Sequence, residues 1–228
     1  MNRRVLIVVI CLALIAAFGA AVLFKPQPQS STASTEQPLA TAQWAANQQA
    51  LVRFHSPTFG PADAPVTIVE FFDPSCEACR AFYPIVKQIL SEYQGQVRLV
   101  LRYTLFHQGS EKVSRILEAA RLQNVYEPVL EAVLEVQPAW HDDPEVTSAW
   151  EAAEAAGLDL IKAREDMQSD RISAILEKDM QDVKTIGIQG TPTFFVNGRQ
   201  LTEFGPKPLL NLVQESLPGS EPSRTVSE

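Results

Sequence analysis

Hydrophobic and polar residues alternate with two different periods along the chain, and the changes of period predict strands and helices in turn. The run VTIVEFFD, Val66–Asp73, is almost continuous in β-branched and aromatic residues, which is typical of a buried central strand. Between residues 82 and 93 the apolar positions recur at spacings of three and four, which predicts a helix with one buried face. VRLVLRYTL, Val97–Leu105, predicts the next strand, so the three elements form a βαβ unit with a right-handed crossover.

A long stretch with helical periodicity follows this unit and predicts helices within residues 110–123, 127–136, 144–157 and 170–187. The segment TPTFFVNGRQLT then predicts a hairpin, with strands at Thr193–Val196 and Arg199–Thr202 joined by the turn Asn197-Gly198. Residues 206–217 predict a last helix. Ahead of the βαβ unit, LVRF, Leu51–Phe54, predicts a short strand.

The N-terminal residues carry the strongest signal for a cellular compartment. Val5–Phe24 holds no charged residue, and at about 1.5 Å per residue it is long enough to cross a hydrocarbon core of about 30 Å. Arg3 and Arg4 precede it, so residues 1–24 predict a signal anchor with the rest of the chain outside the cytoplasm. A cleaved signal peptide is the alternative, because Gly19-Ala20-Ala21 resembles a small-residue cleavage site.

The composition of the remaining chain predicts one domain between two unstructured segments. Residues 25–49 are rich in Pro, Gln, Ser and Thr and predict a flexible linker, and residues 218–228 predict a disordered tail. Residues 50–217 are expected to form the domain, with residues from about 107 to 187 as a helical insertion. The 228-residue chain is 46% hydrophobic and 20% charged, which suits one core of ordinary size. Its formal net charge of −8 argues against a nucleic-acid partner.

Two of the three cysteines in the chain, Cys76 and Cys79, lie where the first strand of the βαβ unit meets its helix. Thiol-disulfide exchange needs an attacking thiolate and a second sulfur near enough to resolve the mixed disulfide. With Ser75 as the expected N-cap, Cys76 falls at the first helical position, where free N–H groups and the helix dipole lower the pKa of a thiol. Cys79, one turn later, is expected to face inward. The pattern therefore predicts Cys76 as the nucleophile and Cys79 as the resolving thiol.

Other uses of a cysteine pair stay open on the residues alone. A structural zinc site usually needs four ligands, and no second Cys pair or closely spaced Cys/His pair is present in the sequence. His55, His107 and His141 are scattered and are interpreted as loop or surface residues, so no metal site is predicted. No cofactor is predicted beyond a redox-active disulfide between the two cysteines. Copper(I) handling by the two sulfurs and a structural disulfide without turnover are the alternatives.

Four motifs follow one another in a characteristic order. They are VEFFDPSCEAC at the strand-to-helix junction, Pro84 five residues after Cys79, the long helical insertion, and GTPTFFVNG at the hairpin. Over about residues 51–217 this order resembles the thioredoxin fold of DsbA-like extracytoplasmic thiol-disulfide oxidoreductases. The resemblance implies the α/β class, a thioredoxin fold with the helical insertion between the βαβ half and the half that holds the hairpin. It also implies a cis peptide bond before Pro192.

The resemblance further implies roles for residues around the cysteines. Glu70 matches a buried acid that moves protons to and from the buried thiol. A carboxylate in an apolar strand is costly unless it has such a task or a partner. The alternative is that this end of the strand is more exposed to water than its pattern indicates and that Glu70 caps a nearby group. Thr191 and Pro192 match a loop that packs against the disulfide and pairs with an extended substrate segment. Glu77 and Ala78 lie between the cysteines and tune the thiolate. The charge of Glu77 opposes that thiolate, which predicts a weaker oxidant than family members with a His there.

The combined prediction is a protein disulfide oxidoreductase, held in the bacterial inner membrane by one N-terminal helix, with its domain on the periplasmic or extracellular side. Expected partners are cysteine-containing exported proteins and a membrane redox partner. Isomerases of related type use an added dimerisation domain, for which the linker is too short, so a monomer is expected. Thr191 nevertheless resembles the isomerase and reductase members, so these activities are alternatives. A chaperone or adaptor that binds unfolded segments without redox turnover is an alternative of another class.

Overall fold

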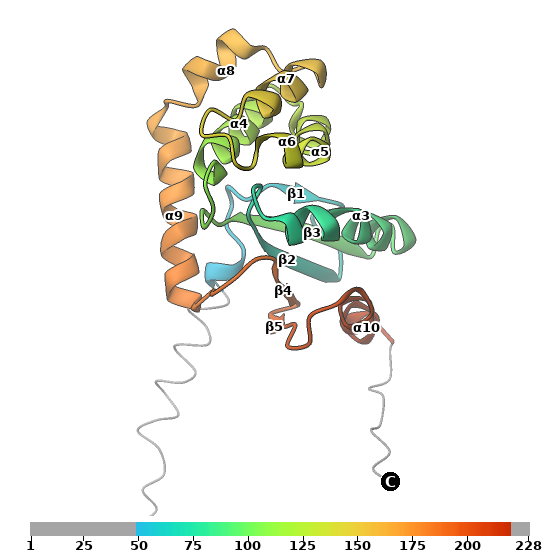
Figure 1. The fold of residues 1–228 in the computed structure, drawn as a ribbon. Helices are drawn as coiled ribbons and strands as arrows, with labels where there is room; N and C mark the ends of the chain where they lie inside the picture. The colour runs from blue at the N-terminus through green and yellow to red at the C-terminus, as the bar shows by residue number, and fades with distance from the viewer. Residues whose placement is uncertain (1–48, 220–228) are drawn as a thin grey trace, which may run out of the picture. The chain divides into compact units, whose positions relative to one another are not determined.

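The structure, a computed structural model, describes residues 49–219 and has a mixed five-stranded sheet at its centre (Figure 1). The strands follow the order β1-β3-β2-β4-β5, in which β2 and β3 are parallel and the other neighbouring pairs are antiparallel. β2, Val66–Phe72, lies between β3, Val97–Tyr103, and β4, Thr193–Val196. The α/β class is therefore confirmed, and β2 is the buried central strand that its apolar run predicts.

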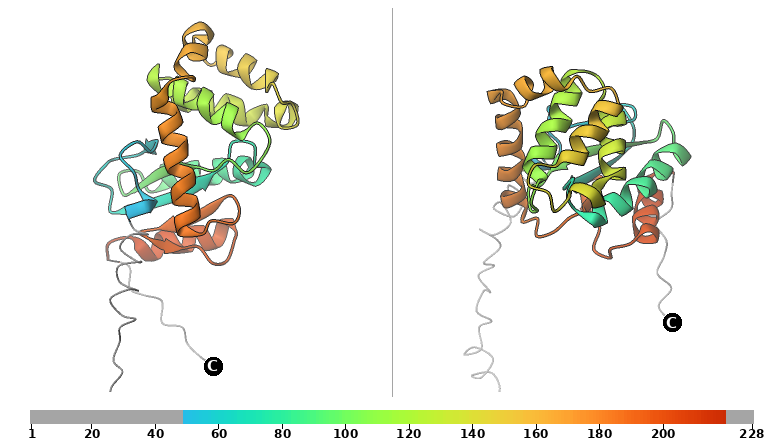
Figure 2. Two further views of the ribbon diagram at one scale, coloured as in Figure 1. Left: turned by 90° about the vertical axis from the view of Figure 1, so that its left-hand side faces the viewer. Right: turned by 45° about the horizontal axis from the view of Figure 1, so that its top comes forward.

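Helices pack on both faces of this sheet. α3, Glu77–Glu92, connects β2 to β3 and completes the predicted βαβ unit, and α10, Pro206–Ser216, packs against α3. Figures 1 and 2 show the helices α4 to α8 gathered on one side of the sheet, with α9 leading the chain back to it. The pattern missed α6 and α8, because four and seven residues are too few for a clear periodicity. The helices between β3 and β4 are α4 Ser110–Leu122, α5 Tyr126–Glu135, α6 Gln137–Trp140, α7 Thr147–Ala155, α8 Leu160–Asp166 and α9 Asp170–Ile186.

β2 alternates its side chains between two cores. Ile68 and Phe72 face the main core, which contains apolar side chains of α3, α10 and the helices of the insertion. Val69 and Phe71 face a smaller core on the side of α9. Because successive side chains of a strand point to opposite faces, Glu70 shares the face of Ile68 and Phe72. Its carboxyl group is therefore directed into the main core, on the side where α3 packs.

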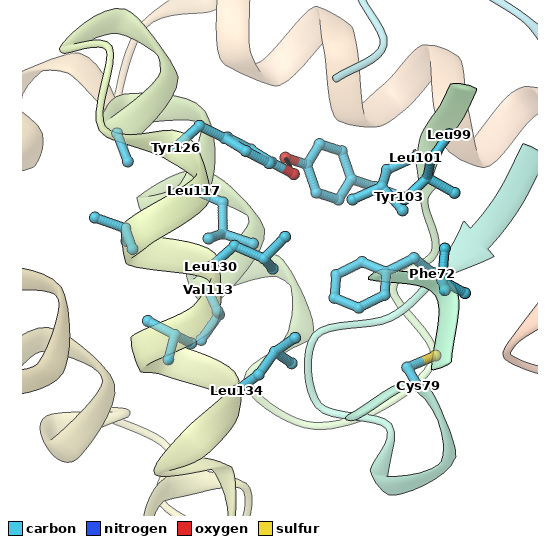
Figure 3. Packing of buried hydrophobic residues seen from close by; sticks show 14 of the residues in the cluster. Phe72, Cys79, Leu99, Leu101, Tyr103, Val113, Leu117, Tyr126, Leu130 and Leu134 are labelled. Atoms are coloured by element: carbon cyan, nitrogen blue, oxygen red, sulfur yellow. Dashed lines mark hydrogen bonds between the residues drawn. The ribbon is translucent and has the colours of Figure 1, made fainter. Parts of the chain in front are cut away.

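The main core joins the helical insertion to the sheet and reaches the cysteine pair. Figure 3 shows apolar side chains of α4 and α5 facing those of β2 and β3, with Cys79 at the border of the cluster. The hydroxyl groups of Tyr103 and Tyr126 lie 2.9 Å apart, and the Tyr103 hydroxyl donates to Glu118 Oε1 at 3.0 Å. Arg121 pairs with the same carboxylate. The polar groups of this buried cluster are thus satisfied by one another, as a stable interior requires.

A cluster of charged side chains lies on the opposite face of the sheet. Arg102 of β3 is fully buried, and its Nη2 donates to Asp179 Oδ1 at 2.7 Å and to Asp182 Oδ2 at 2.8 Å. His55 Nε2 lies 2.8 Å from Asp179 Oδ1, and Arg53 donates to both oxygens of Asp182 at 2.7 Å each. These contacts tie the N-terminal part of the described chain to β3 and α9.

The predicted strand at Leu51–Phe54 is wrong. Leu51 ends a helical turn, and the first strand within residues 49–219 is β1, Thr58–Phe59, which pairs with β3. Leu51 is buried, as its apolar character indicates, but its carbonyl oxygen accepts a hydrogen bond from Arg102 Nη1 at 2.9 Å. Contacts with charged side chains, and not with a neighbouring strand, therefore determine the conformation of this segment.

The hairpin after the insertion is confirmed, with a shorter second strand than predicted. β5 contains only Arg199–Gln200 and pairs with β4. The turn residues Asn197 and Gly198 have φ values of 47° and 82°, the left-handed conformation that an Asn-Gly hairpin turn requires. The hairpin fixes the position of the loop that precedes β4.

Some of the predictions fall on residues that the structure does not describe. The signal anchor at residues 1–24 lies wholly outside the described residues, and so do residues 25–48 of the linker and 220–228 of the tail. No helix within residues 49–219 is long and apolar enough to span a bilayer.

Candidate active site

Cys76 is the N-cap of α3, one position earlier in the helix than the sequence predicts. Its backbone is extended, with φ −79° and ψ 121°, and the helix begins at Glu77. The prediction that Ser75 is the N-cap is therefore wrong. Asp73 closes a turn before the helix, because its carbonyl accepts from the Cys76 N–H at 3.0 Å and its Oδ1 accepts from the Ser75 N–H at 2.8 Å. The N-cap side chain, here the thiol, faces the free N–H groups of the first helical turn.

The environment of Cys76 stabilises a thiolate. The residue is only 7% exposed and forms no disulfide in the structure, and in its protonated form the thiol donates to the carbonyl oxygen of Thr191 at 3.3 Å. A hydrogen bond from the Cys79 thiol, opposed by burial and aided by Thr191 and by the N–H groups of Cys79 and Ala78, lowers the pKa of Cys76 to about 5. The Thr191 hydroxyl has no hydrogen-bond partner in the described part of the chain, so it can donate to the sulfur. Cys76 is therefore mostly ionised at neutral pH.

Cys79 has the opposite environment. It is fully buried in the main core, and its Sγ accepts a hydrogen bond from the backbone N–H of Asp73 at 3.5 Å. Burial, the hydrogen bond to Cys76 and the charge of Glu70 raise the pKa of Cys79 far above its ordinary value. The inward orientation agrees with the helical spacing. One thiol of the pair is thus poised to attack, and the other is held protonated.

Glu70 lies in the interior beside this pair. It is 1% exposed, and its Oε1 has no hydrogen-bond partner among residues 49–219. Burial and the negative charge of Cys76 raise the pKa of Glu70 to about 8. The alternative of a wetter strand end is therefore wrong. A carboxyl group with this pKa can both donate and accept a proton near neutral pH, which is the property that proton transfer to Cys79 requires.

The loop before β4 brings a distant part of the chain to Cys76. The peptide bond between Thr191 and Pro192 is cis, as the resemblance implies. β4 pairs with β2 so that Thr193 lies opposite Phe71. This register places Thr191 at the end of β2 that leads into the cysteine pair, although 115 positions separate it from Cys76.

The two residues between the cysteines differ in their surroundings. The Glu77 side chain is 73% exposed, and its Oε1 lies 4.0 Å from His141 Nε2. A charge so exposed is strongly screened by solvent, so its effect on the thiolate is smaller than its position in the sequence indicates. Ala78 lines a groove together with Pro192 and Phe204.

Asp73 organises the loops around the cysteines, and the sequence interpretation missed it. Its carboxylate is fully buried and accepts hydrogen bonds from the N–H groups of Ser75 and Phe106, both at 2.8 Å. It also accepts from the Ser110 hydroxyl at 2.6 Å and lies 2.9 Å from His107 Nδ1. One carboxylate therefore joins the loop that carries the cysteines to the loop that begins α4. The available signal was an acidic residue between an apolar strand and a Cys pair.

Two grooves share Gly190 and Thr191 in their lining, and Cys76 lines one of them. The first is lined by Cys76, Phe106, His107 and residues 188–191. The second contains Phe204 and apolar side chains of the hairpin. Phe106 is 41% exposed and Phe204 is 56% exposed. An extended peptide that lies along the Thr191 loop can therefore contact the apolar surface of both grooves.

The three histidines do not gather at one site. His55 lies in a loop, as interpreted, but it is buried there and its Nε2 contacts Asp179. The His107 side chain is 49% exposed and contacts Asp73, and that of His141 is 32% exposed. In the part of the chain that the structure describes, no three His, Cys, Asp or Glu side chains form a group that could hold a metal ion.

Comparisons with known proteins agree on the fold. The sequence profile of the thioredoxin family matches residues 54–215. A solved structure of a thioredoxin-like oxidoreductase from Silicibacter pomeroyi DSS-3 is 29% identical, with a TM-score of 0.64, over 74% of this chain and 96% of that chain. The oxidised form of BdbD from Bacillus subtilis is 24% identical, with a TM-score of 0.63, over 71% of this chain and 92% of that chain. The second likeness concerns the fold alone.

Curated relatives match over a small part of their own length. The Na(+)/H(+) antiporter NhaA 3 of Salinispora tropica is 33% identical over 144 residues, which are 62% of this chain and 21% of that protein. The chain thus spans about a fifth of the length of the curated relatives it matches. The similarity concerns that fifth only.

Proposed function

Because this chain belongs to the thioredoxin family and has the fold of DsbA-like thiol-disulfide oxidoreductases, we propose that it exchanges disulfides with exported proteins outside the cytoplasm. The observation that carries the proposal is the opposite tuning of its two thiols. The pKa of Cys76 is lowered to about 5 at a helix N-cap, and that of buried Cys79 is raised far above its ordinary value. Exchange needs this division between an attacking sulfur and a resolving sulfur.

In the oxidising direction, a substrate thiolate attacks Sγ of Cys76 in the Cys76–Cys79 disulfide, and Cys79 leaves as a thiolate. A second substrate thiolate then attacks the substrate sulfur of the mixed disulfide, which forms the substrate disulfide and releases Cys76 as a thiolate. Two electrons pass from the substrate dithiol to the cysteine pair. An oxidising redox partner in the membrane would remove these electrons and restore the disulfide.

Glu70 supplies the proton that Cys79 needs in this scheme. A thiolate buried in an apolar core is costly, so Cys79 takes a proton from the Glu70 carboxyl group as it leaves. In the reverse direction the Glu70 carboxylate accepts the proton and allows Cys79 to attack the mixed disulfide. Its pKa of about 8 suits both transfers near neutral pH.

The Thr191–Pro192 loop is the proposed binding site for the substrate. Its carbonyl lies next to Cys76 Sγ, and the exposed Phe106 and Phe204 lie in the grooves beside it. These features support recognition of an extended, partly apolar segment around a cysteine. We place the domain on the periplasmic or extracellular side of a bacterial membrane, on the strength of the uncharged run at residues 5–24 and the cysteine count.

The stable thiolate supports disulfide donation as the main direction. A thiol that ionises easily favours the reduced protein, and a favoured reduced form makes the disulfide a stronger oxidant. Isomerase or reductase activity is the second candidate, because Thr191 precedes the proline as in those members of the family. Copper handling and an adaptor function are less well supported, because neither needs a buried carboxyl group that exchanges a proton with Cys79.

A trapping experiment tests the proposal. Cys79→Ala in the full-length protein should accumulate mixed disulfides between Cys76 and exported proteins, and their identities would show substrates and direction. Cys76→Ala is the matched control and should trap nothing. If Cys79→Ala captures no protein in cells and Cys76→Ala keeps the biological function, the adaptor alternative replaces this proposal.

A further inference from the structure

Gln137 connects the helical insertion to the backbone of the cysteine loop. It begins α6, is 1% exposed, and lies more than sixty positions from the loop it contacts. Its Nε2 donates to the carbonyl oxygen of Pro74 at 2.6 Å and to that of Cys76 at 3.1 Å. Its Oε1 accepts a hydrogen bond from Arg80 Nε at 3.0 Å. Both polar atoms of this buried side chain are therefore hydrogen-bonded, one to the cysteine loop and one to the helix that follows it.

The orientation of the Gln137 amide follows from its partners. The two carbonyl oxygens can only accept, so they require the NH₂ end, and the Arg80 guanidinium can only donate, so it requires the oxygen end. Arg80 belongs to α3, one position after Cys79, and therefore holds the amide from the side of the redox helix. A buried amide whose hydrogen bonds are all satisfied holds its partner groups in one arrangement.

α6 is itself held rigidly in the insertion. Trp140, at the other end of this short helix, is fully buried, and its Nε1 donates to the carbonyl of Val133 in α5 at 2.9 Å. The packing of the insertion therefore contributes to the position of Gln137, beside its contacts with the cysteine loop. Through the hydrogen bonds of Gln137, the position of α6 influences the backbone conformation at Cys76.

The two carbonyls that Gln137 binds flank the reactive sulfur in the chain. The Cys76 carbonyl also accepts the first hydrogen bond of α3, from the Arg80 N–H at 3.1 Å. Carbonyl oxygens carry partial negative charge, which disfavours a neighbouring thiolate unless donors compensate it. Gln137 compensates both oxygens and holds Cys76 in the extended N-cap conformation that exposes its sulfur to the helix N–H groups.

We propose that Gln137 is a positioning residue of the exchange reaction, through which the helical insertion stabilises the Cys76 thiolate. This inference rests on the proposed function and extends it to the part of the chain that interrupts the thioredoxin fold. Gln137 touches no reacting atom and acts through the backbone of Pro74 and Cys76. Loss of its amide should weaken the thiolate, shift the protein toward its disulfide form and slow attack on substrates.

The test compares Gln137→Met with Gln123→Met in the otherwise complete protein. Methionine keeps the length of the side chain and removes its donors and its acceptor. Gln123 is a matched control in the same insertion, because its Nε2 donates to the Asp159 carbonyl at 3.2 Å and its Oε1 accepts from the Asp159 N–H at 2.9 Å. It bridges two parts of the insertion and makes no contact with the cysteine loop.

The readouts are the thiolate absorbance of the reduced protein against pH and its equilibrium with glutathione. Gln137→Met should raise the pKa of Cys76 by about half a unit and move the equilibrium about threefold toward the disulfide. Gln123→Met should change neither quantity. An unchanged Cys76 pKa and glutathione equilibrium in a folded Gln137→Met protein would overturn the proposal.

Arg80→Met provides a second route if Gln137→Met fails to fold. It leaves the donors of Gln137 in place but removes the group that orients them, so a smaller rise of the Cys76 pKa is expected. The double variant should show no larger shift than Gln137→Met alone, because both residues act through one amide. Additive shifts, or no shift with Arg80→Met, contradict the proposal. The thiolate absorbance needs no substrate, so it separates this inference from a failure of the proposed exchange activity.

Discussion

Carboxylates buried on opposite faces of the central strands, Asp179 and Asp182 on one face and Glu70 on the other, have opposite surroundings. On the α9 face, Asp179 and Asp182 are surrounded by cations, and Arg102 contacts both. Although burial raises it, hydrogen bonds from Arg53 and other cations lower the pKa of Asp182 well below its ordinary range. On the α3 face, Glu70 has one carboxylate oxygen without a hydrogen-bond partner within residues 49–219, and its pKa rises to about 8.

The difference distinguishes carboxylates that hold the fold together from one that can take part in proton transfer. A paired carboxylate keeps its charge at every physiological pH and holds segments of the chain together. An unpaired buried carboxyl group costs stability when it ionises, and this cost brings its proton exchange into the range where thiol chemistry occurs. Substitutions on the two faces test this contrast.

Arg102→Met should be the most damaging change. It leaves two buried carboxylates without their shared cation, so the free energy of unfolding should fall by about 3–5 kcal/mol. Arg98→Met is the control on the same strand, because Arg98 is less buried and contacts Thr67 and the Ala62 carbonyl. Denaturant titration at pH 7 measures both. Similar losses for the two variants would mean that the charged cluster has no special structural role.

Glu70→Gln should stabilise the protein at high pH and slow exchange. The folded protein holds the Glu70 proton up to about pH 8, whereas an unperturbed carboxyl group loses it near 4.5. Between these values the folded state binds more protons than the unfolded state, so this group makes stability fall as pH rises. At pH 8.5 the variant should gain on the order of 3 kcal/mol, and at pH 4 it should gain almost nothing.

Unfolding experiments at both pH values measure this effect, with the exposed Glu135→Gln as the control that should show no pH-dependent gain. The rate of exchange against pH gives the functional readout. If the profile of Glu70→Gln matched that of the unaltered protein, proton transfer by Glu70 would have to be abandoned.

Asp182→Asn should lower the stability of the folded protein, whereas Glu70→Gln raises it, and the change should be smaller. Because the folded pKa of Asp182 is lowered, its contribution is complete above its unfolded pKa near 3.8 and disappears as the pH falls below that value. The variant should lose about 2 kcal/mol at pH 7, and the loss should shrink toward pH 2. Thermal unfolding across this pH range measures it. A loss that stays constant with pH would assign the effect to packing and not to charge.

Glu77→Gln should have the smallest effect. Its side chain is 73% exposed, so removal of its charge should lower the pKa of Cys76 by only a few tenths of a unit and make the redox potential less reducing by under about 10 mV. Equilibration with glutathione measures the potential. A shift of about 20 mV or more would restore the stronger tuning that the sequence alone predicts for Glu77.

Periodicity and local chemistry predicted the elements that have a strong local signal. The apolar run of β2, the amphipathic helix α3 and the Asn197-Gly198 turn are encoded by neighbouring residues, and the structure confirms them. The short α6 had no such signal, and the segment from Leu51 to Phe54 had a misleading one. In each of these cases contacts with distant residues, and not local preference, decide the conformation.

The place of the two sulfurs at a strand-to-helix junction and the acid in the central strand follow from the amino-acid sequence alone. The folded chain adds that Asp73 joins two loops, that Gln137 reaches the Cys76 carbonyl, and that Thr191 lies beside the sulfur. These features depend on the fold because pKa values and side-chain positions depend on burial and on hydrogen-bond partners. Those partners come from segments up to 115 positions away, which no local pattern can specify.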